Sequence, residues 1–325
     1  MKKNTLIIVS ALLVMLLLPA LAGCGGNTAA VEPAGHSGDA DPGSPSGQTE
    51  SSEAERVSER QDGERFEDVI ILEGMEETVR YEHIRNDALG FEMDYDYELF
   101  ERYGGSDREC FVSRYDTTDD PENLLEVSCS PRDAETVAAA VCSVLSLDYE
   151  ISRDDSFPLE RAGSCIRIDA SAEKGGMKMP ERLQAVYIIP AADGCRVAAA
   201  HYSIEAAEGF ARRFRCFMDT FSVIESRGEI RITADRAVSA VMRYCLLGNP
   251  GLAGAVSSGE YPVYWDISSI DENEIVVVFR SYTGAENRYH IDPVSGQTYV
   301  TELVPGIINE EQRTEESLNV WDYLF

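Results

Sequence analysis

The sequence is poor in positive charge. It contains 28 Lys and Arg residues against 58 Asp and Glu residues, which gives a formal net charge of −30. So acidic a surface repels nucleic acid and anionic lipid headgroups, because both are negatively charged. We therefore expect no nucleic-acid partner and no electrostatic attraction of the folded part to a membrane.

The sequence also lacks the short motifs that carry recognisable chemistry. Gly-x-Ser-x-Gly, His-Glu-x-x-His and Gly-x-x-x-x-Gly-Lys are all absent. The eight cysteines form no Cys-x-x-Cys pair and have no zinc-type spacing to the four histidines. We therefore expect no catalytic residue, no metal and no cofactor, and we predict that the protein is not an enzyme.

The first residues do contain a specific motif. Lys2 and Lys3 precede an apolar run from about Thr5 to Leu18, which is too short to span a bilayer and has the layout of a secretory signal. The sequence Leu-Ala-Gly-Cys then ends at Cys24, and it resembles the lipobox of bacterial lipoproteins. The resemblance implies that residues 1–23 are removed, and that a diacylglyceryl group with its palmitate-type chains is attached to Cys24. It places the protein on the cell membrane, lipid-anchored at the extracytoplasmic face.

Seven cysteines remain once Cys24 is assigned to the lipid. An odd number outside the cytoplasm means that at least one thiol is free or pairs between chains. Cys216 should face away from the apolar stripe of its predicted helix, whereas Cys245 should lie on an apolar helix face. We therefore expect Cys216 to be the more reactive thiol of the two.

Residues 24–65 are rich in Gly, Ser, Pro and acids, and are predicted to be a disordered tether. In residues 66–225, alternating apolar and polar residues predict strands, whereas helical spacing predicts one helix capped by Asp133 and a second one after Ser203. The predicted strands are 69–72, 78–81, 90–95, 110–114, 124–129, 165–169, 184–189 and 195–200. The second helix carries an aromatic face made by Phe210, Phe214, Phe217, Met218 and Phe221. This order predicts an α+β fold, an antiparallel sheet covered by helices.

The strand that opens at Gly90-Phe91, the helix after Asp133, the central strands and the closing aromatic helix resemble the PsbP-type sandwich. The resemblance covers about half of the chain. In that family the fold serves as an accessory binding module, so the resemblance implies a binding role.

A second, smaller α+β domain is expected at residues 230–303. Thr233 is the predicted cap of a helix with Ala237, Val241 and Cys245 on one face, and a meander of strands at 263–267, 275–279, 288–291 and 298–300 follows. The helix, the meander and the turn at 292–296 are similar to PepSY-like lipoprotein modules, although here the module is a single copy. That family consists mostly of non-catalytic inhibitory or interaction units. Residues 304–325 are predicted to be an acidic, irregular tail whose apolar end docks on a domain.

One cluster of possible binding residues can be named in the second domain. By strand parity Arg288 and His290 share a face, and Arg280 joins them from the neighbouring strand. Such a patch could receive a carboxylate or a sugar acid, or it could be a solvated sheet face that balances nearby acids.

These patterns predict a membrane-anchored extracytoplasmic lipoprotein that acts as a non-catalytic binding or interaction module. Its partners would be the membrane, through the lipid on Cys24, and an unknown protein or cell-wall component. The alternative is a cell-envelope hydrolase or transferase whose acidic site the sequence does not display. A cleft that holds two carboxyl groups of raised pKa would favour that alternative.

Overall fold

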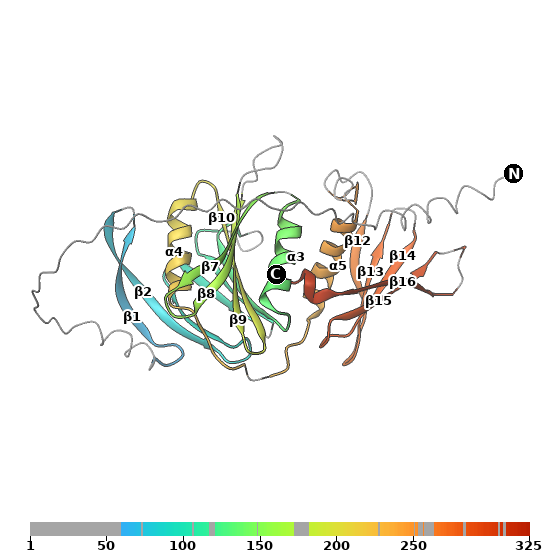
Figure 1. Ribbon diagram of the computed structural model, residues 1–325, viewed down its shortest axis with the longest axis horizontal. Helices are drawn as coiled ribbons and strands as arrows, with labels where there is room; N and C mark the ends of the chain where they lie inside the picture. Colours follow the sequence, from blue (N-terminus) through green and yellow to red (C-terminus); the bar gives the residue numbers. More distant parts are fainter. Residues whose placement is uncertain are drawn as a thin grey trace, which may run out of the picture. The chain divides into compact units, whose positions relative to one another are not determined.

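The structure is a computed structural model, and it describes residues 60–325 except 73, 106, 117–120, 148, 172–181, 227, 250, 253–255, 257–262, 282–283, 305 and 308–309. The described strands form three antiparallel sheets that are accompanied by helices, so the fold is α+β as the sequence predicts (Figure 1). No helix among the described residues is long and apolar enough to cross a bilayer.

The first sheet has four strands in the order β1-β2-β3-β11. Its strands are β1 (Arg65–Leu72), β2 (Met75–Asn86), β3 (Phe91–Asp96) and the short β11 (Ser222–Val223). Gly74 has φ +81° in the turn between β1 and β2, a conformation that glycine adopts without steric cost. Because β1 is first in the strand order, it is an edge of this sheet, and it pairs along its whole length with β2.

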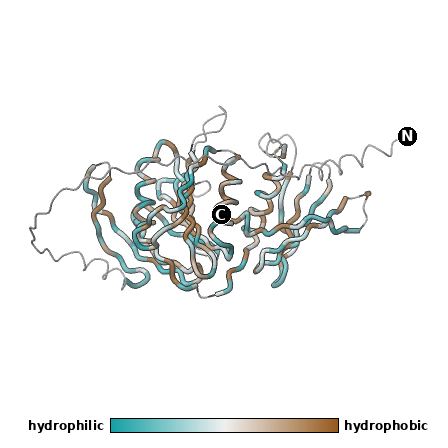
Figure 2. Tube along the Cα trace, viewed as in Figure 1, coloured by the Kyte–Doolittle hydropathy of each residue, from teal (hydrophilic) through white to brown (hydrophobic). Residues whose placement is uncertain are grey.

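The second sheet has seven strands in the order β4-β5-β6-β10-β9-β8-β7. The bounds are β4 (Phe100–Gly104), β5 (Arg108–Ser113), β6 (Leu124–Ser130), β7 (Glu150–Leu159), β8 (Gly163–Ser171), β9 (Arg182–Ala191) and β10 (Gly194–Ser203). Ala198, Ala200 and Tyr202 of β10 belong to one hydrophobic core, whereas Val197 and Ala199 belong to another. This alternation means that the sheet is covered on both faces. Figure 2 shows hydrophobic stretches along this part of the chain.

The helices α3 (Ala134–Leu145) and α4 (Ala207–Asp219) cover opposite faces of this seven-stranded sheet. Asp133 is the N-cap of α3 as predicted, since its carboxylate accepts a hydrogen bond from the Thr136 backbone N–H at 2.9 Å. The aromatic face of α4 packs in the core shared with the four-stranded sheet, where Phe214 and Phe217 contact Phe100. Each fully buried Phe stabilises the fold by about 1.5–3 kcal/mol.

The third sheet has five strands in the order β12-β13-β14-β15-β16. The bounds are β12 (Tyr264–Ile270), β13 (Ile275–Arg280), β14 (Glu286–Ile291), β15 (Gln297–Leu303) and β16 (Gln312–Asn319). The helix α5 (Ala234–Gly248) and the 3-10 helix η1 (Val320–Tyr323) pack on one face of the sheet. The meander and the predicted turn at 292–296 are confirmed, because Asp292 accepts hydrogen bonds from the backbone N–H groups of Val294 and Ser295.

The structure corrects several sequence-based predictions. The prediction of an irregular tail is wrong for Gln312–Asn319, which form β16. The apolar end of the chain does pack against the protein, and Trp321 is buried in the core under the five-stranded sheet. Thr233 occupies the N-cap position of α5, but its hydroxyl donates to Asp107 Oδ2 instead of capping the helix. Residues 60–65, assigned by sequence to the tether, belong to the described structure, and Arg65 opens β1.

Candidate functional site

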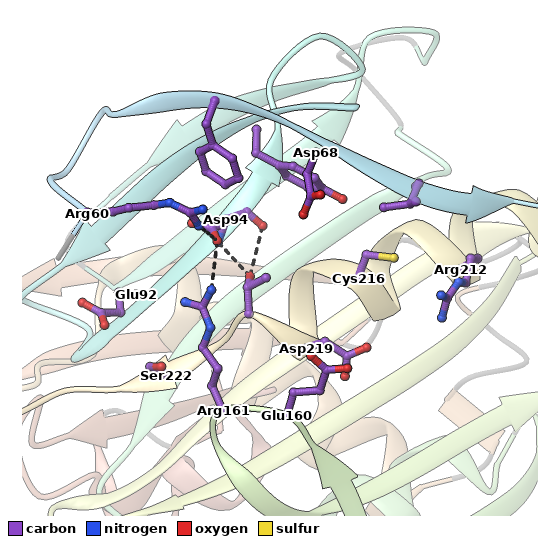
Figure 3. Close-up of a pocket in the computed structure, with 14 residues that line it drawn as sticks. Arg60, Asp68, Glu92, Asp94, Glu160, Arg161, Arg212, Cys216, Asp219 and Ser222 are labelled. Carbon is purple, nitrogen blue, oxygen red and sulfur yellow. Dashed lines mark hydrogen bonds and ion pairs between the residues drawn. The ribbon is translucent and has the colours of Figure 1, made fainter. Parts of the chain in front are cut away.

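The described residues form a pocket of about 780 Å³, which we call the Asp94 pocket. Side chains reach it from β1, β2, β3 and α4, from the turn between β7 and β8, and from Arg60 ahead of β1. Figure 3 shows that Arg60 and Arg161 approach Asp94 from different directions, while Cys216 lies on α4. The pocket therefore draws on parts of the chain that are far apart in sequence.

A carboxylate with three hydrogen-bond donors lies at the base of this pocket. The Asp94 side chain is 2% exposed, and its Oδ1 lies 2.6 Å from Nδ1 of the equally buried His83. Its Oδ2 accepts hydrogen bonds from Arg60 Nη1 at 2.9 Å and from Arg161 Nη2 at 3.3 Å. Burying an unpaired carboxylate is costly, so these three donors are what allow Asp94 to occupy this position.

The backbone explains why His83 and Asp94 meet. β2 and β3 pair so that His83 lies directly opposite Asp94. The backbone N–H of Asp94 donates to Thr220 Oγ1 at 2.9 Å, which fixes the strand against the end of α4. Since His83 is 1% exposed and does not line the pocket, it orients Asp94 and cannot itself touch a ligand.

An aromatic wall faces Asp94 inside the pocket. The Arg60 guanidinium carbon lies 3.5 Å from the centroid of the Phe66 ring, and Phe66 stacks on Tyr81 with ring centroids 5.6 Å apart. Burial raises the pKa of the Tyr81 hydroxyl, so the ring presents a neutral surface. A cation held between a carboxylate and a ring face is stabilised by both.

The rim of the Asp94 pocket is acidic. Its lining includes five carboxylates, from Asp68, Glu92, Asp94, Glu160 and Asp219, against three guanidiniums, from Arg60, Arg161 and Arg212, which leaves a formal charge of 3 − 5 = −2. No Arg, Lys or His in the described part of the chain lies within 4.0 Å of the Asp68 or Glu160 carboxylate. Among the described residues, these two carboxylates are therefore without a cationic partner and can serve as ligand contacts.

The Cys216 thiol also lines the pocket. The prediction that Cys216 faces away from the aromatic stripe is consistent with this position, but the thiol is partly covered and burial raises its pKa. Cys245 is likewise partly covered, and its sulfur lies 3.3 Å from the Tyr289 hydroxyl.

The three residues predicted as a binding patch do come together. Arg280 and Arg288 both pair with Glu286, while Arg288 and His290 both contact Glu311, all on the sheet face opposite to α5. The His290 ring also stacks on Tyr299 with ring centroids 4.4 Å apart. Three glutamates, Glu274, Glu286 and Glu311, therefore balance the two arginines and the histidine. The described residues of this patch therefore carry no excess of positive charge, and its binding role stays a prediction.

Cys24 lies outside the described residues. Among the described residues no group of three or more His, Cys, Asp or Glu side chains is arranged to hold a metal ion. Burial raises the pKa of the Asp96 carboxyl, but Asp96 pairs with Arg213 at 3.2 Å and does not line the Asp94 pocket.

Sequence reasoning missed the residues that build the Asp94 pocket. The sequence pattern assigns Asp94 only to a strand of alternating apolar and acidic residues, and it assigns Arg60 to the tether. Both β2 and β3 mix apolar and polar residues along their length, so no local signal distinguishes His83 or Asp94 from the other polar side chains of these strands.

No protein-family model matches the chain, and no curated protein matches its sequence. Solved structures with a similar arrangement include a protein of Bacteroides thetaiotaomicron VPI-5482, with 12% identity, a TM-score of 0.29 and coverage of 61% of this chain and 86% of that chain. The Ran-binding protein Mog1p of Saccharomyces cerevisiae has 12% identity and a TM-score of 0.30, with coverage of 45% of this chain and 96% of its own. Both are α+β sandwich folds, compatible with the architecture described above. At these TM-scores neither likeness bears on function.

Proposed function

We propose that the chain is an extracytoplasmic lipoprotein, anchored in the cell membrane through Cys24, that acts as a non-catalytic binding module. The Asp94 pocket is its ligand site. The lipobox-like sequence that ends at Cys24 supports the anchor. The resemblance of residues 66–225 to PsbP-like domains and of residues 230–303 to PepSY-like modules supports a binding or interaction role.

The observation that carries the binding role is the environment of Asp94. Both of its oxygens accept hydrogen bonds from side chains of the protein, so the carboxylate is held in place and three of its roughly four lone-pair positions are occupied. The three donors compete with a substrate for the lone pairs that a general base or nucleophile has to offer, which makes Asp94 poorly suited to either role. A fixed, paired carboxylate at the base of a pocket instead provides a preorganised surface for recognition.

Site-directed photocrosslinking in intact cells tests this proposal. Glu160 lies on the exposed turn between β7 and β8 and lines the Asp94 pocket, so a photoreactive residue there touches a bound partner without entering the core. Tyr115 is 81% exposed and does not line the pocket, so the same residue at Tyr115 is the matched control.

We expect a discrete adduct from position 160 and none from position 115. The adduct should weaken when Asp68→Asn is added, because Asp68 lines the same pocket and makes no described ion pair. Equal crosslinking from both positions, or an adduct that Asp68→Asn leaves unchanged, would argue that the pocket is not the ligand site.

A further inference from the structure

The Asp94 pocket already holds a guanidinium group, and that group comes from the chain itself. Arg60 places its guanidinium between the Asp94 carboxylate, 2.9 Å away, and the face of the Phe66 ring, 3.5 Å away. The two contacts together form a cation subsite, since one supplies an ion pair and the other a cation–π contact.

Arg60 is attached to this subsite only by its side chain. It precedes β1 and takes no part in the pairing of β1 with β2. The described contacts of Arg60 are made by its guanidinium, with Asp94 and Phe66. The side chain can therefore leave the subsite without breaking any strand pairing.

Asp94 would remain satisfied after Arg60 leaves. His83 and Arg161 still donate to it, so the carboxylate stays in position. The lining without Arg60 carries five carboxylates against two guanidiniums, a formal charge of 2 − 5 = −3. A vacated subsite is therefore more attractive to a cation than the filled one.

We propose that the Asp94 pocket binds a guanidinium group of its ligand, and that Arg60 is an internal competitor that occupies the same subsite in the absence of ligand. This inference rests on the proposed function, and it adds the chemical class of the ligand. The ligand's guanidinium takes the place between Asp94 and Phe66, while Asp68 and Glu160 at the rim are open to further donors on the ligand.

Binding of a blocked arginine, acetylated at its amine and amidated at its carboxyl, tests the inference. The matched probe is blocked citrulline, which has nearly the same shape without the charge. The dissociation constants are measured by calorimetry, and occupancy of the pocket is followed by protection of Cys216 from alkylation, because Cys216 lines the same cavity. Wild-type protein should bind the arginine probe and not the citrulline probe.

The variant Arg60→Ala should bind the arginine probe about tenfold more tightly than wild type. In wild type only the fraction of molecules whose subsite is free of Arg60 can bind, and the apparent affinity is the intrinsic affinity multiplied by that fraction. Arg65→Ala is the charge-matched control. Arg65 is also an arginine near the start of β1, but it pairs with Glu82 and does not line the pocket. The Arg65 variant should bind like wild type.

Two results would overturn the inference. Equal affinity of wild type and Arg60→Ala would show that Arg60 does not compete. Binding by Arg60→Ala alone, with none by wild type, would show that the probe merely fills a cavity left by a structural side chain. If no guanidinium probe binds either protein while the crosslink from position 160 still forms, the ligand class is wrong and the binding function stands. If that crosslink does not form either, both the ligand class and the binding function are refuted.

A last comparison identifies the source of the guanidinium. A pentapeptide with a central arginine between glycines should bind more tightly than blocked arginine if the natural ligand is a polypeptide side chain. Equal affinity would indicate a small molecule. Either result supports the guanidinium subsite.

Discussion

Replacing Asp94 with Ala removes the acceptor that three donors share. Arg60, Arg161 and His83 would all lose a hydrogen bond, and the two guanidiniums would face each other without a carboxylate between them. Breaking a buried ion pair by removing one partner costs about 3–5 kcal/mol, because the remaining charge is left desolvated.

The exposure of the two arginines sets the expected magnitude within that range. Their side chains retain 20% and 23% of their accessible surface, so water can partly rehydrate them after the carboxylate is gone. His83, at 1%, cannot be rehydrated in this way. We therefore expect a loss near the lower end, about 3 kcal/mol in the free energy of unfolding. For a chain of this size that corresponds to a decrease in Tm of about 6–12 °C.

Urea unfolding and thermal unfolding of the purified folded part measure this loss. Asp68→Asn is the control, since Asp68 lines the same pocket without a described ion pair, and it should change the unfolding free energy by less than about 0.5 kcal/mol. If Asp94→Ala costs no more than Asp68→Asn, Asp94 is not the buried centre of an ion-pair cluster, and the reasoning about the pocket's base fails.

Three further perturbations have defined outcomes. Arg196, with a fully buried side chain, holds the pKa of the Asp193 carboxyl below its usual range. The pair's contribution to stability is therefore present above the unfolded-state pKa of about 4 and is lost as pH falls through the lower folded-state pKa. Urea unfolding should show Asp193→Asn less stable than wild type at pH 7, with a smaller difference in unfolding free energy at pH 3, and an equal difference at both pH values would contradict the pairing. Arg288→Ala removes two ion pairs of a part-exposed arginine, with Glu286 and Glu311, and Glu286 keeps Arg280 as a partner. The variant should lower the unfolding free energy by less than about 1 kcal/mol, and it should weaken partner capture if the predicted patch binds. Equal capture would remove the patch from consideration. Cys24→Ala should abolish both lipid labelling and processing after residue 23. Metabolic labelling with palmitate measures the first, and the mass of the protein recovered from cells measures the second. Persistent labelling of the variant would contradict the anchor.

The elements that sequence predicts best are those whose pattern is complete within a short window. The aromatic stripe of α4 and the capped α3 are examples, because helical spacing and a local hydrogen bond define them. The strands β9 and β10 are similar, since each is apolar along most of its length.

Strands with little burial were missed. β7 lies at the edge of its sheet, where most of its side chains are exposed, and β16 alternates exposed and partly buried residues in an acidic stretch. In β4 only Phe100 is buried, so no periodicity marks the strand. Edge strands are specified by their partners more than by their own residues.

The Asp94 pocket could not be predicted for a different reason. Its contacts join residues that are 34 and 67 positions apart in the chain, so no local spacing reveals them. The patch at Arg280, Arg288 and His290 shows the converse case. Strand parity predicts that the three residues share one face, and a face that balances nearby acids is one of the two interpretations given above. Glu311 precedes a strand that the sequence does not reveal, so the sequence does not identify it as one of those acids.

The rate at which Cys216 reacts with a membrane-impermeant maleimide tests the central claim most directly. It is measured by peptide mass spectrometry on intact cells and on purified protein, each normalised to a cysteine introduced at the exposed position 115. If the folded part is extracytoplasmic as proposed, Cys216 should react in intact cells. If a ligand occupies the Asp94 pocket that Cys216 lines, the reaction should be slower in cells than in purified protein. Cys245, which contacts Tyr289, should react slowly in both. Labelling of positions 115 and 216 only after cell lysis would contradict the location, and equal normalised rates for Cys216 in cells and in solution would contradict an occupied binding pocket.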